Sequence, residues 1–230
     1  MPGTNQFDRD RVLPCLRNSR MNIREFIGFG GVVLTADVVG NEDHPCVVLL
    51  PSLTQTRKVW ESAAKALAQA GRYVISLDLR GHGGSDSPKD CNYSLDAFMG
   101  DLVAVLAQLE SRPVVVGSNF GGWIGLAALG NTSAPIATGL VLTNPPPEFQ
   151  SLNNKSIAKT VSERASTEDF DQGLFAGGFD FIELQSKLEP AAKNLKLPTL
   201  LVRGIDSQIS SSDATQRFAE LILQAEVSEI

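Results

Sequence analysis

Short apolar runs alternate with helical hydrophobic repeats along most of this chain. The runs at 24–29 and 32–39 flank a Gly-Gly pair and predict a β-hairpin. The continuous apolar run Cys46–Leu50 is typical of a strand that is buried on both faces. Further apolar runs predict strands at 73–77, 113–116, 140–143, 199–202 and 225–230.

Apolar residues at helical spacing predict helices between these strands, at 59–70, 94–110, 121–129 and 213–223. Ser94 is the expected cap of the second helix, and Asp213 with Gln216 forms an expected capping box for the last one. A hairpin followed by repeated β-α alternation predicts the α/β class, with a mostly parallel, doubly wound sheet. In such a sheet, binding sites lie at the carboxyl ends of the strands.

A single domain accounts for most of the chain. Residues 1–21 are polar and lack a hydrophobic period, so we expect a loose amino-terminal tail before a domain at 22–230. Residues 145–197 interrupt the β-α alternation with a polar stretch that contains prolines, glycines and several phenylalanines. We expect these phenylalanines to serve mainly in packing.

Composition narrows the classes of partner. The chain is 43% apolar and 20% charged, as a globular domain with a sizeable core is. A net charge of −6 without a basic run argues against nucleic acid and anionic membrane surfaces as partners. No stretch approaches the about 20 apolar residues of a membrane span, and residues 1–20 lack the apolar centre of a signal peptide. We therefore expect a cytoplasmic protein with no membrane contact.

The cysteines Cys15, Cys46 and Cys91 lie far apart and form no CxxC pair, which predicts reduced thiols without a disulfide or a zinc site. Cys46 lies within an apolar run and is expected in the core. The sequence has no pair of ligands at metal-binding spacing, no GxGxxG and no Walker loop. We expect neither a metal nor an organic cofactor.

Three motifs, in order along the chain, resemble landmarks of the α/β-hydrolase family. Residues 117–121, Gly-Ser-Asn-Phe-Gly between a strand and a helix, resemble its nucleophile elbow, G-x-nucleophile-x-G. Residues 79–86 resemble the loop after its fourth strand, and residues 198–204 resemble the strand before its catalytic acid. The resemblance covers residues 22–230 and implies the α/β-hydrolase fold, with 145–197 as a short cap insert.

The same resemblance places Asn119 at the nucleophile position, at a sharp strand-to-helix turn. We expect its backbone angles to lie in the left-handed or the bridge region. The family carries Ser, Asp or Cys there, whereas a carboxamide is a poor nucleophile. Ser118, one residue earlier, is an alternative, displaced nucleophile. The resemblance assigns the oxyanion hole to the backbone N–H groups of Phe120 and Leu53.

The other catalytic positions of the family also differ here. The acid would follow Gly204 by three or four residues, where the chain has Ser207 and Gln208, and Asp206 comes early. The alternative acid position, after the sixth strand, holds Asn144. The family's base is a histidine after the eighth strand, and the sequence ends within that predicted strand.

The two histidines lie elsewhere. His82 falls in the Arg-Gly-His-Gly turn, where the family usually has a structural residue, and His44 precedes a proline on a loop before a buried strand. Since the reaction needs a nucleophile, a base and an acid together, the pattern is that of a pseudoenzyme.

Three functional hypotheses remain open. The first is a non-hydrolytic protein with a pocket for a small apolar or aromatic molecule or for non-hydrolytic chemistry. The second is a fragment or mutated form of a hydrolase acting on small esters, epoxides or alkyl halides. The third is an interaction protein without a ligand. Because the predicted pattern ends in a strand with an unpaired edge, we also expect a homo-oligomer through this C-terminal edge.

Overall fold

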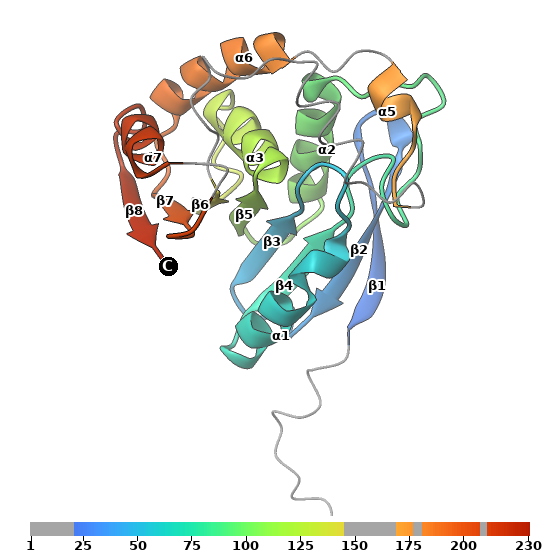
Figure 1. The fold of residues 1–230 in the computed structure, drawn as a ribbon. Coiled ribbons are helices and arrows are strands. Elements are labelled where there is room, and N and C mark those ends of the chain that lie inside the picture. Colours follow the sequence, from blue (N-terminus) through green and yellow to red (C-terminus); the bar gives the residue numbers. More distant parts are fainter. Residues whose placement is uncertain (1–20, 145–168, 177–180, 208–210) are drawn as a thin grey trace, which may run out of the picture.

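The computed structural model describes residues 21–144, 169–176, 181–207 and 211–230. Within these residues one eight-stranded sheet runs in the order β1-β2-β4-β3-β5-β6-β7-β8 (Figure 1). The strands are β1 Asn22–Ile27, β2 Val33–Val39, β3 Cys46–Leu50, β4 Tyr73–Leu77, β5 Val114–Ser118, β6 Gly139–Thr143, β7 Thr199–Arg203 and β8 Ala225–Glu229. The predicted strands are all present, with bounds shifted by one or two residues.

The sheet is antiparallel at one edge and parallel elsewhere. β1 pairs antiparallel with β2, Phe26 opposite Leu34, and β2 pairs antiparallel with β4. The remaining neighbours are parallel. This confirms the predicted α/β class and the mostly parallel sheet of the α/β-hydrolase type. From β3 the chain crosses to β4 on one side and then to β5 on the other. The carboxyl ends of β3 and β5 thus form a switch point, where open α/β sheets bind ligands.

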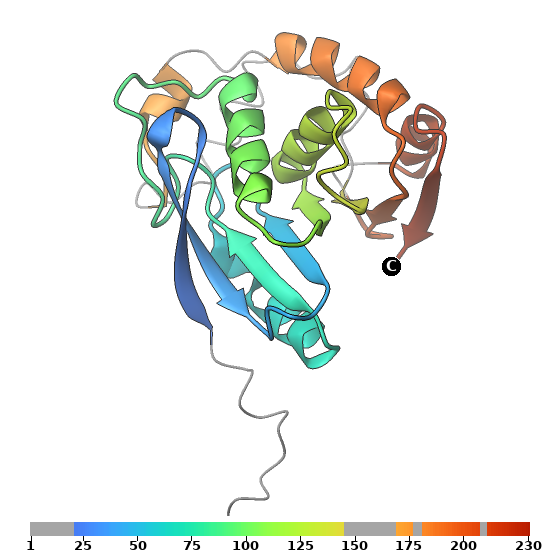
Figure 2. The same ribbon diagram turned by 180° about the vertical axis from the view of Figure 1, so that it is seen from behind.

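Helices cover both faces of the sheet (Figure 2). Their bounds are α1 Glu61–Gln69, α2 Leu95–Ala107, α3 Phe120–Gly130, α5 Gly173–Ala176, α6 Phe181–Asn194 and α7 Ser212–Ala219, with short 3-10 turns η3 Phe29–Gly31 and η4 Arg57–Trp60. α1 lies on one face over a small apolar cluster that includes Val47 and Leu49. α2 and α3 lie on the other face.

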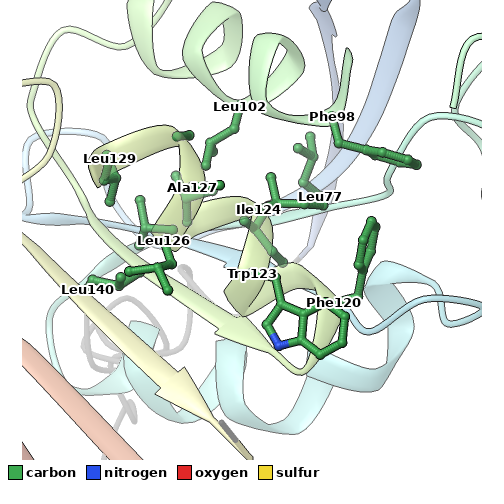
Figure 3. Close-up of a cluster of buried hydrophobic side chains, with 14 of the residues drawn as sticks. Leu77, Phe98, Leu102, Phe120, Trp123, Ile124, Leu126, Ala127, Leu129 and Leu140 are labelled. Atoms are coloured by element: carbon green, nitrogen blue, oxygen red, sulfur yellow. The ribbon is translucent and has the colours of Figure 1, made fainter. Parts of the chain in front are cut away.

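The main core lies between the sheet, α2 and α3 (Figure 3). Every residue of α3 is buried, because this helix is covered by the sheet below it and by α2 and α6 at its sides. Phe98 of α2 meets Phe120 of α3 edge-to-face, with ring centroids 5.1 Å apart. Phe120, the first residue of α3, is therefore held by packing on several sides.

Cys46 is buried as expected, and desolvation raises the pKa of its thiol to about 11.

Two helix caps can be compared with their predictions. The Ser94 hydroxyl accepts a hydrogen bond from the Ala97 N–H at 3.2 Å, as expected. The predicted capping box of Asp213 and Gln216 is wrong. Ser211 caps α7 instead, accepting from the Ala214 N–H at 3.1 Å, which places Asp213 inside the first turn.

Part of the predicted cap insert belongs to the helical layer. α6, which ends near the carboxyl end of residues 145–197, packs along α3. The contact is close: a Cβ at Gly130 would lie 2.7 Å from the Ala191 carbonyl carbon. Residues 145–168 and the amino-terminal tail 1–20 lie outside the described residues. The domain bounds therefore stay predictions.

Candidate functional site

Backbone strain gathers at one end of the sheet. In the described part of the chain, four residues other than glycine have positive φ, and three of them follow neighbouring parallel strands: Thr54 (66°), Asn119 (47°) and Asn144 (50°). They come after β3, β5 and β6, beside the switch point. Strained residues of this kind cluster at functional sites, where the surrounding structure holds them in place. These positive-φ residues and the switch point thus lie at the same end of the sheet, where the parallel strands have their carboxyl ends.

The turn from β5 to α3 has Asn119 at its apex. Its φ of 47° and ψ of −112° are far from those of a strand or a helix. The expected unusual backbone angles are present, but the expectation of a left-handed or bridge conformation is wrong, because ψ lies outside both regions. Two hydrogen bonds fix the turn: the Asn119 N–H donates to the Thr143 carbonyl at 3.1 Å, and the Trp123 N–H donates to the Asn119 carbonyl at 3.1 Å.

Glycines let the backbone close around this apex. A Cβ at Gly121 would lie 2.6 Å from the Leu50 carbonyl oxygen, and a Cβ at Gly117 would lie 2.5 Å from the Gly121 carbonyl oxygen. Only glycine fits at such approaches. The first turn of α3 therefore lies directly against the end of β3. The loop that carries Leu53 and the helix start at Phe120 thereby face the same part of the sheet edge.

His82 lies near this edge, and both of its ring nitrogens are engaged. Nδ1 lies 2.8 Å from the Arg80 carbonyl oxygen, and Nε2 lies 3.2 Å from the backbone nitrogen of Thr54. Since a carbonyl only accepts and a backbone N–H only donates, the proton sits on Nδ1 and the ring is neutral. Burial lowers the pKa of His82, which favours the same neutral form. The structural role expected of this histidine agrees with these contacts.

His44 lies at the other end of the strands, where the parallel strands have their amino ends. It occupies the turn immediately before β3, where its N–H donates to the Asn41 carbonyl at 3.0 Å. The amino end of β3 is a full strand length from the turn that holds Asn119. Neither histidine of the sequence is therefore placed as a base at Asn119.

The predicted acid region follows β7. Asp206 is exposed, and the Ser207 N–H donates to the Gly204 carbonyl at 2.9 Å in a tight turn. Gln208 lies outside the described residues. Asn144 is nearer to the apex: it follows Thr143, which bonds to Asn119, and its own N–H donates to the Val202 carbonyl at 2.9 Å.

Ser118, the alternative nucleophile, ends β5 opposite Thr143 of β6 and is partly buried. It still belongs to the strand ladder, whereas the apex is one residue later. The structure therefore brings Ser118, Asn119 and Asn144 to one edge, and places Asp206 on the surface.

Two buried ion pairs that the sequence did not indicate support the loops around this edge. Asp78, directly after β4, pairs with the Arg57 side chain and accepts from the backbone N–H groups of Arg57 at 2.6 Å and Gly84 at 2.8 Å. Arg80 donates to both oxygens of Asp101, at 2.6 and 2.7 Å. The Asp-Leu-Arg-Gly segment at 78–81 was the available signal, but its partners come from distant loops.

Other classes of site find little support in the part of the chain that the structure describes. No group of three or more His, Cys, Asp or Glu side chains there is arranged to hold a metal ion. None of the described helices is long and apolar enough to cross a membrane.

The chain resembles known proteins over most of its length. Residues 45–188 match a family model described as "alpha/beta hydrolase fold". A putative carbamate hydrolase RutD of Variovorax paradoxus is 34% identical over 109 residues, 47% of this chain and 41% of that protein. Epoxide hydrolase A of Mycobacterium tuberculosis is 33% identical over 93 residues, 40% of this chain and 29% of that protein. These matches span less than half the length of either relative.

Among solved structures, the thioesterase domain from the curacin biosynthetic pathway superposes with a TM-score of 0.73. It shares 18% sequence identity, and the alignment covers 92% of each chain. At this identity the likeness concerns the fold.

Proposed function

Because the chain belongs to the α/β-hydrolase fold family, we propose that it is a non-hydrolytic member that binds a small apolar or aromatic molecule at the β5–α3 turn. In this proposal the turn is the family's nucleophile elbow, with Asn119 in the nucleophile position. The observation that carries it is the pairing of an intact, strained apex at Asn119 with the two ring nitrogens of His82 already bound to backbone. The strained apex is kept, and neither His44 nor His82 is placed to activate it.

Binding would use backbone groups rather than a nucleophile. The N–H groups of Leu53 and Phe120 are the proposed donors to a carbonyl oxygen of the ligand, in the manner of an oxyanion hole. The close approach of Gly121 to Leu50 supports this, because it sets the loop after β3 against the first turn of α3. Asn119 would add a neutral amide, which both donates and accepts. We propose no metal or organic cofactor.

Turnover of p-nitrophenyl acetate tests the first half of the proposal. Loss of the nucleophile or the base alone costs about 10⁶ in turnover in a serine protease, so we expect the wild-type rate to lie about 10⁶-fold below that of a complete serine hydrolase. Asn119→Ser and Asn119→Asp should remain at the wild-type rate, because neither His44 nor His82 is placed as a base at the apex. Turnover by the wild type that Ser118→Ala abolishes would instead identify Ser118 as a displaced nucleophile.

Binding of acetanilide tests the second half. This neutral aromatic amide offers one carbonyl oxygen and does not hydrolyse readily. We expect amide resonances of Leu53, Asn119 and Phe120 to shift on titration, while those at the opposite edge, such as His44, stay constant. If no small carbonyl compound of a panel shifts these resonances, an interaction protein without a ligand becomes the better account.

A hydrolase is the second candidate, favoured by one observation. The segment Gly-Ser-Asn-Phe-Gly-Gly is similar to the Gly-x-Asp-Trp-Gly-Gly of epoxide hydrolases and haloalkane dehalogenases, and differs from it in the nucleophile. In this alternative the sequence is part of, or a mutated form of, a hydrolase acting on small esters, epoxides or alkyl halides, with Asp206 or Gln208 in its acid region. A gain of epoxide or ester turnover in Asn119→Asp or Asn119→Ser would favour it.

A further inference from the structure

The imidazole of His82 joins three segments that are far apart in the sequence. Through Nδ1 it donates to its own loop, at the Arg80 carbonyl. Through Nε2 it accepts from Thr54, in the loop after β3. Its ring lies against Phe170 of the predicted cap insert, with ring centroids 6.0 Å apart. At 1% exposure the side chain is enclosed by these partners.

Thr54, which donates to Nε2 of His82, has a strained backbone conformation. The Gln55 N–H donates to the Ser52 carbonyl at 3.1 Å, so residues 52–55 form a β-turn with Thr54 in its third position. A φ of 66° there, with Leu53 outside the positive region, is the pattern of a type II turn. Glycine or asparagine usually occupies that position, and a β-branched residue is strained in it. The hydrogen bond from the Thr54 N–H to His82 holds the strained residue in place.

Backbone hydrogen bonds hold the segment that carries Phe170 against the loop of His82. The Gly83 N–H donates to the Asp169 carbonyl at 2.9 Å, and the Asp171 N–H donates to the Gly81 carbonyl at 2.7 Å. These two bonds flank an antiparallel bridge between His82 and Phe170. The Tyr93 hydroxyl adds a bond to the Asp171 carboxylate at 2.5 Å. The segment 169–171 is therefore part of the wall that fixes the plane of the imidazole.

We infer that His82 is a positioning residue: as the neutral Nδ1–H tautomer it holds the Leu53–Thr54 turn in its strained conformation and links that turn to the segment 169–171. The consequence for ligand binding rests on the proposed function, in which the Leu53 N–H contacts the ligand. A change in the insert that moves Phe170 would then reach the Leu53 N–H through the side chain of His82.

Three variants separate the two ring nitrogens. In His82→Gln the side-chain oxygen reaches about as far as Nε2 and still accepts from Thr54. In His82→Asn the shorter amide reaches only as far as Nδ1, so it bonds Arg80 and leaves Thr54 without an acceptor. His82→Phe keeps the ring against Phe170 and removes both bonds. The readouts are amide hydrogen exchange at Thr54 and at Asp171, and the ring ¹⁵N resonances of the wild type.

We expect the wild-type ring to show the Nδ1–H tautomer, and Thr54 exchange to quicken about tenfold or more in His82→Asn and His82→Phe, as loss of one hydrogen bond predicts. In His82→Gln it should stay within about twofold of the wild type. An Nε2–H tautomer, or Thr54 exchange that is equal in the Asn and Gln variants, would overturn the inference. If the Phe variant does not fold, the Asn and Gln pair still decides.

Acetanilide titration of the same variants tests the link to function. We expect weaker binding in His82→Asn than in His82→Gln, by at most the factor of the change in exchange, because affinity falls only as far as the binding-competent turn is depopulated. Equal binding by these two variants would remove the link to the ligand. If the wild type does not bind acetanilide at all, the proposed function fails, while the tautomer and the exchange rates of the ligand-free protein still judge the role of His82.

Discussion

The backbone N–H of Asn119 donates to the carbonyl oxygen of Thr143 at 3.1 Å, which fastens the apex of the β5–α3 turn to the last residue of β6. The next residue along, Asn144, repeats the arrangement by donating to Val202 of β7 at 2.9 Å. Each strained residue is thus bonded to the neighbouring strand through its backbone. The conformation at position 119 should therefore persist when its side chain is changed.

Replacing Asn119 by glycine should relieve this strain. Its φ and ψ lie in a region that glycine enters far more easily than other residues, and strain of this kind costs of order 1–3 kcal/mol. Asn119→Ala is the matched control, because it removes the carboxamide and keeps the Cβ. After allowance for the greater freedom of glycine in the unfolded chain, we expect Asn119→Gly to exceed Asn119→Ala in stability by about 1 kcal/mol. Urea unfolding measures both, and equal stabilities would show that the backbone here is relaxed.

Gly121→Ala should be severely destabilising. The added Cβ would lie 2.6 Å from the Leu50 carbonyl oxygen, and both groups belong to backbone that is packed against the sheet. We expect a loss of about 3 kcal/mol, at the upper end of what overpacking a core costs, because the neighbouring atom is backbone. Gly125→Ala in the same helix is the control, because its Cβ would meet only side chains, at 3.1 Å or more. A loss for Gly125→Ala as large as for Gly121→Ala would mean that α3 tolerates no added atom and that the turn is not special.

Asp101 and Asp96 lie on the same helix and pair with cations in different surroundings. Asp101 accepts two bonds from the buried Arg80, whereas Asp96 pairs with Lys187 and is 69% exposed. Removing one member of a buried pair costs about 3–5 kcal/mol, and an exposed pair contributes about 0–1 kcal/mol. Asp101→Ala should therefore lower the unfolding free energy strongly and Asp96→Ala hardly at all. Similar losses for the two would contradict the assignment of Asp101 to the core.

The sequence predicted the strands well because each parallel strand is buried on both faces and reads as a continuous apolar run, as in Cys46–Leu50. It also predicted a sharp turn with unusual backbone angles at Asn119, because glycines flank it. The actual φ and ψ could not be predicted, because the partners of the Asn119 N–H and carbonyl, Thr143 and Trp123, become visible only in the folded chain.

The surroundings of His82 were beyond the sequence for a related reason. Thr54 lies 28 residues before it, and Phe170 is much farther along the chain. Neither residue carries a local pattern that points to an imidazole. The cap of α7 was mispredicted because Ser211 and Asp213 are both good capping residues, and the sequence pattern alone does not distinguish them.

Acidification should destabilise the fold through His82. Burial lowers the pKa of His82 in the folded chain below the ordinary value of about 6.5. At a pH between these two pKa values, His82 is protonated in the unfolded chain and neutral in the folded chain. The carboxylates of Asp78 and Asp171 raise the pKa of His82, but by less than burial lowers it. Stability is therefore fully present above about pH 6.5 and falls as the pH drops towards the lowered pKa, by at most about 1.4 kcal/mol per pH unit.

His82→Gln is the control for this pH dependence, because it keeps an acceptor for Thr54 and does not titrate. Unfolding in urea across the window should give a smaller slope against pH for His82→Gln than for the wild type. Equal slopes would assign the pH dependence to other groups.

The edge strand β8 offers the last test, which concerns assembly. Among the described residues it closes one side of the sheet, and Val227 within it is 38% exposed, with Leu223 and Ile230 more exposed beside it. We propose that a second copy of this chain pairs with this edge. An antiparallel pair about a twofold axis at Val227 matches residues equally distant from it, so Glu226 faces Ser228 and Ala225 faces Glu229, and no two carboxylates lie directly opposite.

A lysine in the centre of this edge should prevent the pairing, since two lysines would face each other across the axis. We therefore expect the wild type to sediment as a dimer at high protein concentration and Val227→Lys to sediment as a monomer. Val103→Lys is the matched control, because Val103 of α2 is also 38% exposed and lies away from the edge. A wild type that stays monomeric up to the highest concentration reached would overturn the proposal. So would dissociation that is equal in the two variants, because it would then follow from the added charge rather than from its place on β8.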